Sequence, residues 1–380
     1  MKPTYRSLKV RLKPRNNQEK LLWQSSGTAR WAYNHCLDKQ IKNYAENKTF
    51  LSNQDIRKQI TQLKKEEEFS WLSNVSAQIP KQAIKDCCAA YVNFFKKKSS
   101  FPRFKSKKKS KPSFYVDNHK IKFSYKKVYV EKIGYITLAE FGRIPFAEET
   151  KYSNPRITFD GKYWYVSVGI KITEFSKENR EKNNLVLGID LGIKEFAVIS
   201  NGRKFGNVNK TKKVKKIKKK LRRLQRKVSR KYLKNKDGKK FIKTNNIVKL
   251  EKKIVLIHRR LRNIRENHIY EIIDYLVKTK PDKIIIENLN IKGMMKNRHL
   301  AKAIQEQCWY KFITLLTHKC EKYGIELFQV DRFFASSKIC SNCGCIKTDL
   351  KLKDRVYVCN DCGNKLDRDL NAAINLSKCG

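Results

Sequence analysis

Two Cys-x-x-Cys pairs near the C-terminal end constrain the fold of this chain more than any other short pattern. The pairs are Cys340 with Cys343 and Cys359 with Cys362, and a glycine follows the second cysteine of each. At this spacing, two knuckles supply the four thiolates of a tetrahedral zinc site. A redox dithiol needs one such pair and not two. The pattern therefore predicts a zinc ribbon. Its zinc either only stabilises a small loop or belongs to a module that also contacts a ligand. Cys345 is not expected to bind the zinc.

The charge of the chain is strongly unbalanced. Among 380 residues, 87 Lys and Arg stand against 35 Asp and Glu, which gives a formal net charge of +52. AT-rich codon usage explains part of the lysine excess, but it should also enrich Glu. A compact fold with this charge repels itself unless a polyanion neutralises it. Because the basic residues are spread over several segments and no run of about 18 apolar residues occurs, the predicted partner is nucleic acid rather than membrane.

The compartment follows from the opening residues and the cysteines. The first residues, MKPTYRSLKVRLKP, alternate charged and apolar side chains and do not resemble a signal peptide. The cysteines outside the two pairs are scattered, which favours a reducing compartment and a metal over a disulfide framework. We expect the protein in cytosol, nucleoid or nucleus.

The N-terminal half changes its periodicity several times. Alternation at residues 8–12 predicts a strand that ends at Pro14, and helical spacing follows from about 17 to 97. The segment 96–111 is a basic connector, which we expect to be an exposed loop that grips a nucleic-acid backbone. Strand signals resume between about 113 and 172. We therefore predict a β-barrel from residues 1–14 and 113–180, with residues 15–112 inserted as a helical module.

The C-terminal half has the element order of an α/β nuclease. After a polar linker near 173–184, the sequence predicts strands, a long helical hairpin around an Asp237-Gly238 turn, and further helices. In chain order these are strands at 185–190 and 196–199, the hairpin within 207–267, a strand at 283–287, a helix around 300–322, a strand at 325–330 and a last short helix.

The outward faces of the predicted hairpin are crowded with basic side chains. A solvated helical face usually mixes charges to avoid repulsion four residues apart, whereas acids are nearly absent between residues 203 and 250. We therefore favour phosphate binding over a merely solvated face. The residues chosen for this role are Lys219, Arg222, Arg226 and Arg230.

Three acids stand out by position, at the ends of two predicted strands and at the start of the last helix. They are Asp190, Glu287 and Asp369. Any one alone is more often a surface residue or a helix cap, as we expect for Asp367. A carboxylate beside apolar runs is costly unless a cation compensates it. Three that converge can hold two divalent ions about 4 Å apart for phosphodiester hydrolysis, and Mg²⁺ prefers such an oxygen shell. The element order is that of an RNase H-like fold.

The same residues carry a family resemblance. Residues 185–376 resemble the split RuvC-like nuclease of the transposon-encoded TnpB proteins through GIDLGIKEFAV, IIIENL, FFASSKICSNCG, CNDCG and DRDLNAAINL. GTARWAYNHCL, SWLSNV and FPRFK extend the resemblance over the N-terminal half.

The resemblance implies an RNA-guided endonuclease that cuts double-stranded DNA beside a short adjacent motif, with a guide RNA transcribed from the transposon end. Asp190, Glu287 and Asp369 are then the catalytic, metal-binding acids for Mg²⁺ or Mn²⁺. The zinc ribbon, residues 336–363, interrupts a nuclease formed by 181–335 and 364–380. The expected location is the nucleoid-associated cytoplasm of a prokaryote, with no membrane partner and no required oligomer.

The resemblance also places the reading of the adjacent motif in the helical module and barrel. When the chain is aligned with the family on Trp71, the positions that read the motif in the family fall near Asn53, Arg57, Gln78 and Lys81. This chain departs from the family's usual residues at several of these positions. Arg103 and Lys105 of the connector are further candidates for backbone contacts. For each, the alternative is an ordinary exposed residue.

Two other functions remain open at this level. An unguided RuvC-like recombinase or resolvase would act on branched DNA without RNA. A guided or zinc-ribbon DNA-binding repressor would bind without cutting, although the intact acid trio argues against it.

Overall fold

A computed structural model describes most of the chain: residues 4–108, 110–147, 150–172, 183–332, 334–351 and 354–379. The chain divides into two compact units, Met1–Glu174 and Phe175–Gly380. Most of the linker expected near 173–184 lies outside the described residues. All eleven cysteines are free thiols. Across the described ranges, every helix is too short or too polar to cross a bilayer.

The first unit contains a seven-stranded sheet built around β1 (Thr4–Lys13). Its alternating sequence lets β1 pair along most of its length with β7 (Trp164–Ile172) and at Leu12 and Lys13 with β5 (Gly134–Leu138). The strand order is β2-β6-β7-β1-β5-β4-β3. The other strands are β2 (Ser113–Tyr115), β3 (Lys122–Phe123), β4 (Lys127–Val130) and β6 (Tyr152–Phe159).

The strands expected for the barrel lie in one sheet. β2 and β3 form its two ends, and the described residues show no pairing between them. The strands expected between 113 and 172 are present, and β1 joins two sets of strands through its different partners. Barrel closure is therefore left unconfirmed.

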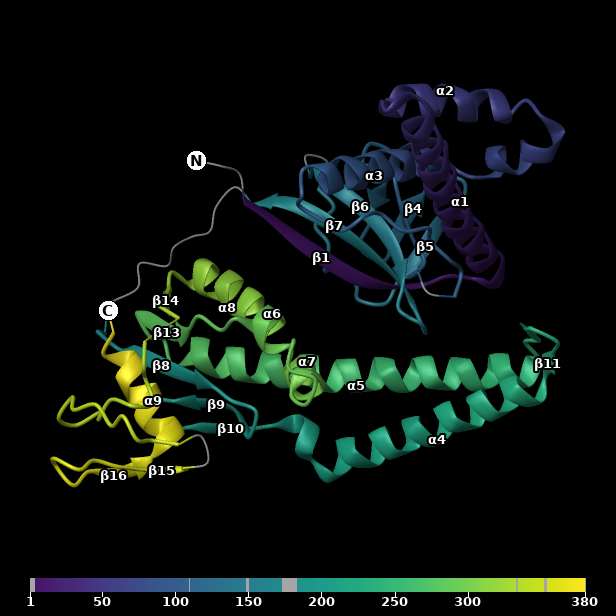
Figure 1. Ribbon diagram of the computed structural model, residues 1–380. Coiled ribbons are helices and arrows are strands. Elements are labelled where there is room, and N and C mark those ends of the chain that lie inside the picture. Colours follow the sequence, from purple (N-terminus) through teal and green to yellow (C-terminus); the bar gives the residue numbers. More distant parts are fainter. Residues whose placement is uncertain are drawn as a thin grey trace. The chain divides into compact units, whose positions relative to one another are not determined.

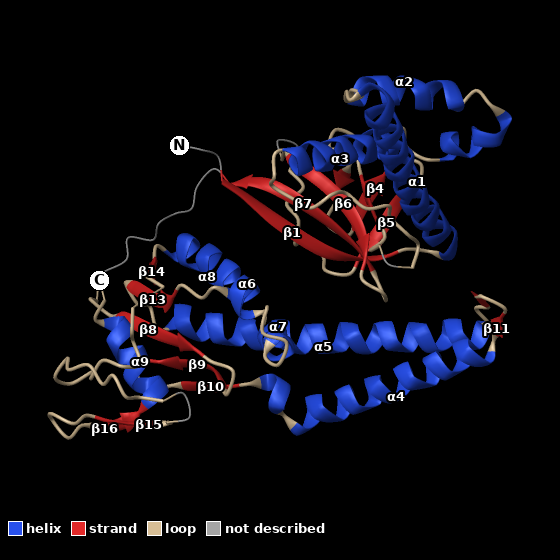
Figure 2. Cartoon of the chain, in the orientation of Figure 1, coloured by secondary structure: helices blue, strands red, loops and turns tan. Residues whose placement is uncertain are grey.

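Helices occupy the region predicted as a helical module (Figures 1 and 2). They are α1 (Asn16–Asn47), α2 (Asn53–Leu63), the 3₁₀ segment η1 (Glu67–Asn74) and α3 (Gln78–Phe95). Leu22, Leu37 and Ile84 are completely buried and join one core with the inward side chains of the sheet. Apolar burial at helical spacing therefore fixes the module on the sheet.

The second unit is built on a five-stranded sheet in the order β10-β9-β8-β13-β14. Strand β8 (Val186–Leu191) runs parallel to β13 (Lys283–Glu287), which runs parallel to β14 (Glu326–Val330). β9 (Glu195–Ile199) pairs antiparallel with β8 and with the short β10 (Lys204–Gly206). This arrangement contains the strands predicted for the nuclease.

The two faces of this sheet are covered by different helices (Figure 1). Leu187 and Ile189 point to a core that includes residues of α5 (Asn245–Lys278) and α8 (Trp309–Tyr323). On the other face, α9 (Arg368–Ser377) packs on β8 and β13. A Cβ atom at Gly188 would lie only 2.0 Å from the carbonyl oxygen of Ala373, so glycine permits this close approach.

The long hairpin is formed by α4 (Lys212–Lys234) and α5, which lie side by side (Figure 1). Thr211 and Thr244 cap the two helices through their side chains. Ile217, Leu221 and Leu261 form part of the seam between them. At the expected turn, β11 (Lys236–Asp237) pairs with β12 (Lys240–Phe241). The hairpin prediction is confirmed, with α5 extending beyond 267.

One predicted helix is broken in the structure. The helix expected around 300–322 divides into α7 (Ala301–Gln307) and α8 at Cys308, whose φ of 58° lies in the left-handed region. No glycine or proline marks this position, so the sequence pattern did not reveal the break. Two short elements, η2 (Val208–Lys210) and α6 (Ile291–Met294), complete the unit's described helical segments.

Candidate active site and metal centre

The three acids singled out by position come together at one edge of the second unit's sheet. Asp190 lies on β8 and Glu287 ends β13, and these neighbouring parallel strands are in register up to Ile189 and Ile286. Asp369 lies in the first turn of α9, which packs across both strands. Strand pairing and helix packing thus bring together residues separated by most of the unit's sequence.

The electrostatics of Asp190 show how closely the acids are crowded. Burial, together with the negative charges of Glu287 and Asp369, raises the pKa of Asp190 well above its ordinary value. Arg368 opposes this effect without overcoming it. A half-buried group of like charges is unfavourable unless a cation compensates it. The donor set therefore fits a divalent cation, for which carboxylate oxygens are suitable ligands.

Neighbouring side chains hold the second and third acids in place. Ser336 donates a hydrogen bond from Oγ to Glu287 Oε1 at 2.7 Å. Asp367 caps α9, because its Oδ1 accepts hydrogen bonds from the backbone N–H groups of Asp369 and Leu370, which confirms the predicted cap. Its other oxygen lies 2.7 Å from Lys204 Nζ on β10. The start of α9 is therefore tied to the sheet edge.

Two asparagines of α9 hold the neighbouring chain segment in place, a role that the sequence pattern did not reveal. Asn371 donates to the carbonyl oxygen of Ile339 and accepts from the backbone N–H of Ser341. Asn375 donates to the carbonyl oxygens of Ser336 and Ile339. Both amides are buried. They fasten the segment that bears Ser336 and the first cysteine knuckle to the helix that bears Asp369.

The four cysteines of the two pairs form one cluster. Their sulfur atoms all lie within 4.8 Å of one another, an arrangement that could hold a metal ion. Cys345 is outside this group, as expected. The second pair, Cys359 and Cys362, lies in the loop that joins the antiparallel strands β15 (Val356–Val358) and β16 (Lys365–Asp367).

Backbone geometry at the knuckles favours thiolates. Gly344 and Gly363 have φ angles of +82° and +67°, which glycine adopts without strain. Although burial opposes ionisation, hydrogen bonds from the backbone N–H groups of Cys343 and Asn342 lower the pKa of Cys340 to about 6. In contrast, although a backbone hydrogen bond at Cys345 opposes the effect, the neighbouring thiols raise the pKa of Cys343, so complete ionisation of the cluster calls for a compensating cation.

Three family profiles match parts of the chain. One described as "Probable transposase" matches residues 166–298, one described as "Cas12f1-like, TNB domain" matches 309–376, and one described as "Helix-turn-helix domain" matches 1–49. The structure shows residues 16–47 as a single helix preceded by a strand, so the last description does not fit the local fold.

Full-length relatives decide the family. The chain is 30% identical, over 100% of its length and 90% of the relative's, to a protein of Streptomyces pristinaespiralis named "Putative RNA-guided DNA endonuclease". It is 26% identical to the similarly named InsQ of Escherichia coli (strain K12), over 98% of this chain and 92% of the relative. The chain belongs to the TnpB family.

The fold of this TnpB-family chain is shared with a protein of known structure. A structure titled "Cryo-EM structure of the Cas12f1-sgRNA-target DNA complex" matches with a TM-score of 0.57 at 14% identity, covering 99% of both chains. At this identity the likeness shows that the two chains share a fold.

In this TnpB-family chain, the four basic residues of the hairpin that were predicted to bind phosphate are all exposed. Lys219, Arg222, Arg226 and Arg230 lie on α4 with their side chains in solvent. At the base of the hairpin, by contrast, basic side chains are neutralised, because Lys218 and Arg265 both pair with Glu306. The exposed set is therefore available for a polyanion.

The candidates for reading an adjacent motif lie on two helices that contact each other. Asn53 and Arg57 are on α2, and Gln78 and Lys81 are on α3. Lys81 is exposed, whereas Arg57 is half-buried and its Nε has no hydrogen-bond partner among the described residues. The structure brings the four into one module.

Most of the connector is the exposed loop that the sequence predicted. Arg103 is exposed, but Pro102 is buried and Lys105 is half-buried. The backbone of Lys105 is fixed to Asn34 of α1 by two hydrogen bonds, of 2.7 and 2.8 Å. The exposed-loop prediction is therefore confirmed for most of the segment, and tertiary hydrogen bonds dock it locally at Lys105.

Proposed function

We propose that this protein is an RNA-guided endonuclease that cuts double-stranded DNA beside a short adjacent motif, with a guide RNA transcribed from the end of its transposable element. The observation that carries the proposal is the convergence of Asp190, Glu287 and Asp369 in a TnpB-family chain. Guide pairing supplies the sequence specificity, and the protein supplies the contacts to backbone and motif.

The three acids hold the catalytic divalent ions in this proposal, with Mg²⁺ as the natural metal and Mn²⁺ as a substitute. Such ions lower the pKa of water and stabilise the oxygen that leaves a phosphodiester. Ser336 orients Glu287, and the cap at Asp367 fixes the helix that presents Asp369.

The presence of a guide RNA can be tested by sequencing the nucleic acid that copurifies with the protein. The full chain, expressed with its native flanking DNA and washed at high salt, is expected to retain a discrete RNA with a variable 3′ end. Sequencing of that RNA provides the readout. A mixture of host RNA fragments that modest salt removes would show nonspecific electrostatics only and would contradict the proposal.

The cysteine cluster holds one structural zinc ion in this proposal. Zinc at such a site contributes directly to folding. The ribbon, residues 336–363, is inserted between the parts 181–335 and 364–380 of the nuclease, and the asparagine contacts of α9 join it to the acid site.

Replacing one zinc ligand is expected to remove the metal and to lower thermal stability. Cys359→Ser should reduce the zinc content from one ion per chain to near zero, because three thiolates cannot complete the site. Metal analysis by mass spectrometry and a melting curve measure both effects. Cys345→Ser, in the same ribbon, is the control and should keep its zinc; equal zinc loss in both variants would contradict the ligand assignment.

The exposed basic residues of α4 bind nucleic-acid phosphates in this proposal. Arg222→Ala and Arg226→Ala should each weaken binding for all sequences alike and reduce the salt slope of the affinity by about 1, as expected when one phosphate contact is lost. Filter binding across a salt series measures this slope. Lys278→Ala on α5, where Asp274 neutralises the lysine, is the control and should leave the slope unchanged.

We assign the reading of the adjacent motif to the module that bears Asn53, Arg57, Gln78 and Lys81. Lys81 supports this role because its side chain is exposed, whereas the Nε atom of Arg57 is buried and the side chain would have to move to reach a base edge. Arg103 remains a candidate backbone contact because it is exposed.

A further inference from the structure

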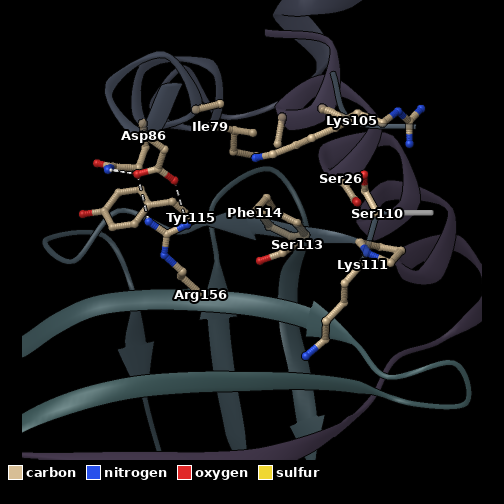
Figure 3. A pocket seen from close by; sticks show the side chains of 15 residues that line it. Ser26, Ile79, Asp86, Lys105, Ser110, Lys111, Ser113, Phe114, Tyr115 and Arg156 are labelled. Carbon is tan, nitrogen blue, oxygen red and sulfur yellow. Dashed lines mark hydrogen bonds and ion pairs between the residues drawn. The ribbon is translucent and has the colours of Figure 1, made fainter. Parts of the chain in front are cut away.

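A pocket of about 250 Å³ lies within the N-terminal unit, between α1, α3, the connector and the sheet (Figure 3). It contains none of the residues assigned above to catalysis or zinc. Its charged lining residues are Arg30, Asp86, Lys105, Lys111 and Arg156. The pocket is therefore a separate site with its own chemistry.

The lining carries an excess of positive charge. Arg156 and Asp86 neutralise each other through two hydrogen bonds of 2.9 and 3.1 Å. Arg30, Lys105 and Lys111 have no ion-pair partner in the part of the chain that the structure describes. Asp86 also acts on Lys105, and Figure 3 shows the ammonium group of Lys111 pointing away from the other labelled charges, but the lining as a whole is still positive. A positively charged lining favours an anionic ligand.

Lys105 is the most strongly positioned of these cations. Its backbone is fixed to Asn34, and its Nζ lies 3.5 Å from the centroid of the Tyr33 ring. In Figure 3 its side chain extends into the pocket toward the side where Asp86 meets Arg156. Burial lowers the pKa of Lys105, because the ammonium group has lost part of its hydration. An anion in the pocket would restore that lost stabilisation.

The remaining walls suit the uncharged parts of a nucleotide. Ile79, Ala83 and Phe114 provide apolar surface, and Ser26, Ser110 and Ser113 provide hydroxyl groups. The cavity is too small for a duplex. A lysine with a flexible stem is a common ligand for phosphate.

We propose that this pocket binds a single phosphorylated nucleotide, with the phosphate at Lys105 and the base or sugar against Ile79 and Phe114. The nucleotide is either free or an unpaired unit of the bound nucleic acid, since both present the same phosphate and base. The proposal goes beyond the nuclease function: binding of a free nucleotide is independent of it, whereas the strand-borne form rests on the proposed guided binding of DNA.

The first test uses full-length protein freed of nucleic acid. Calorimetric titration with dTMP and with AMP at constant ionic strength is expected to show saturable binding, and Lys105→Met should weaken it by at least about tenfold, the effect of losing a charged hydrogen bond. Lys107→Met removes the same charge from an exposed site on the same connector and is the control. Lys105→Arg keeps the charge and should recover most of the affinity, which separates binding from misfolding.

The second test identifies the source of the nucleotide. Binding of a target duplex by the protein–guide complex is measured for the same variants, without any cleavage step. If dTMP or AMP binds and Lys105→Met abolishes that binding, the pocket accepts free nucleotide. If neither binds, but Lys105→Met weakens the complex and Lys107→Met does not, the nucleotide belongs to the strand. No loss in either assay, or equal loss for both variants, overturns the proposal.

Discussion

In a complex of protein, guide RNA and target DNA, Asp190→Asn lowers the cleavage rate by at least about 1,000-fold, equivalent to about 4 kcal/mol of lost transition-state stabilisation. The amide keeps the shape of the side chain but removes the charge that binds the metal ions. Guided binding should stay within about twofold, because pairing and backbone contacts are independent of this carboxylate. Single-turnover cleavage on a gel and filter binding on the same preparation measure the two quantities.

This prediction has a matched control variant and an outcome that would contradict it. Asp274→Asn replaces an exposed carboxylate on α5 that pairs with Lys278, and it should cut at the normal rate. If wild-type protein and Asp190→Asn repress a target equally and neither cuts it, the chain is a guided binder rather than a nuclease.

The raised pKa of Asp190 predicts how the stability of the folded protein changes with pH. Because the pKa is raised in the folded state, the folded protein binds this proton more tightly than the unfolded chain does. Without added Mg²⁺ and with the zinc site loaded, stability should therefore fall as pH rises from the ordinary carboxyl range through the raised pKa. Asp190→Asn should remove that part of the decline, and Mg²⁺ should reverse it in the wild type only. Melting curves across a pH series provide the measurement.

Gly188→Ala is expected to displace α9 and to abolish cleavage, although residue 188 bears no functional group. Its new Cβ would lie 2.0 Å from the carbonyl oxygen of Ala373 and 2.5 Å from the backbone nitrogen of Ser377, and neither backbone atom can rotate away. Overpacking of this kind typically costs about 1–3 kcal/mol. Asp369, carried by the displaced helix, would leave the other two acids.

Gly206→Ala is the control for this steric effect. It lies on β10 of the same sheet, where the added Cβ would meet only a flexible Glu195 oxygen at 3.5 Å. Cleavage and melting temperature should both fall for Gly188→Ala and remain near wild type for Gly206→Ala. A Gly188→Ala protein that cuts normally would show that the approach of α9 to β8 is not required for the site.

The sequence was sufficient for the elements whose signals are local. The cysteine spacing identified the ligand cluster, because two knuckles close on one ion through short-range turns. Apolar spacing identified β8, β13 and the hairpin of α4 and α5, because burial imposes a period on each element. The cap at Asp367 followed from side-chain chemistry at a helix start.

Features that depend on distant contacts required the tertiary structure. The break at Cys308, the docking of Lys105 on α1 and the clamps from Asn371 and Asn375 join residues whose relation leaves no periodic trace. The same holds for Gly188, which reads as an ordinary strand residue until α9 packs against it. The acids could be named from the chain, but their mutual distance is set by strand register and helix docking. Local free energies decide which element forms, and packing between elements decides which side chains meet.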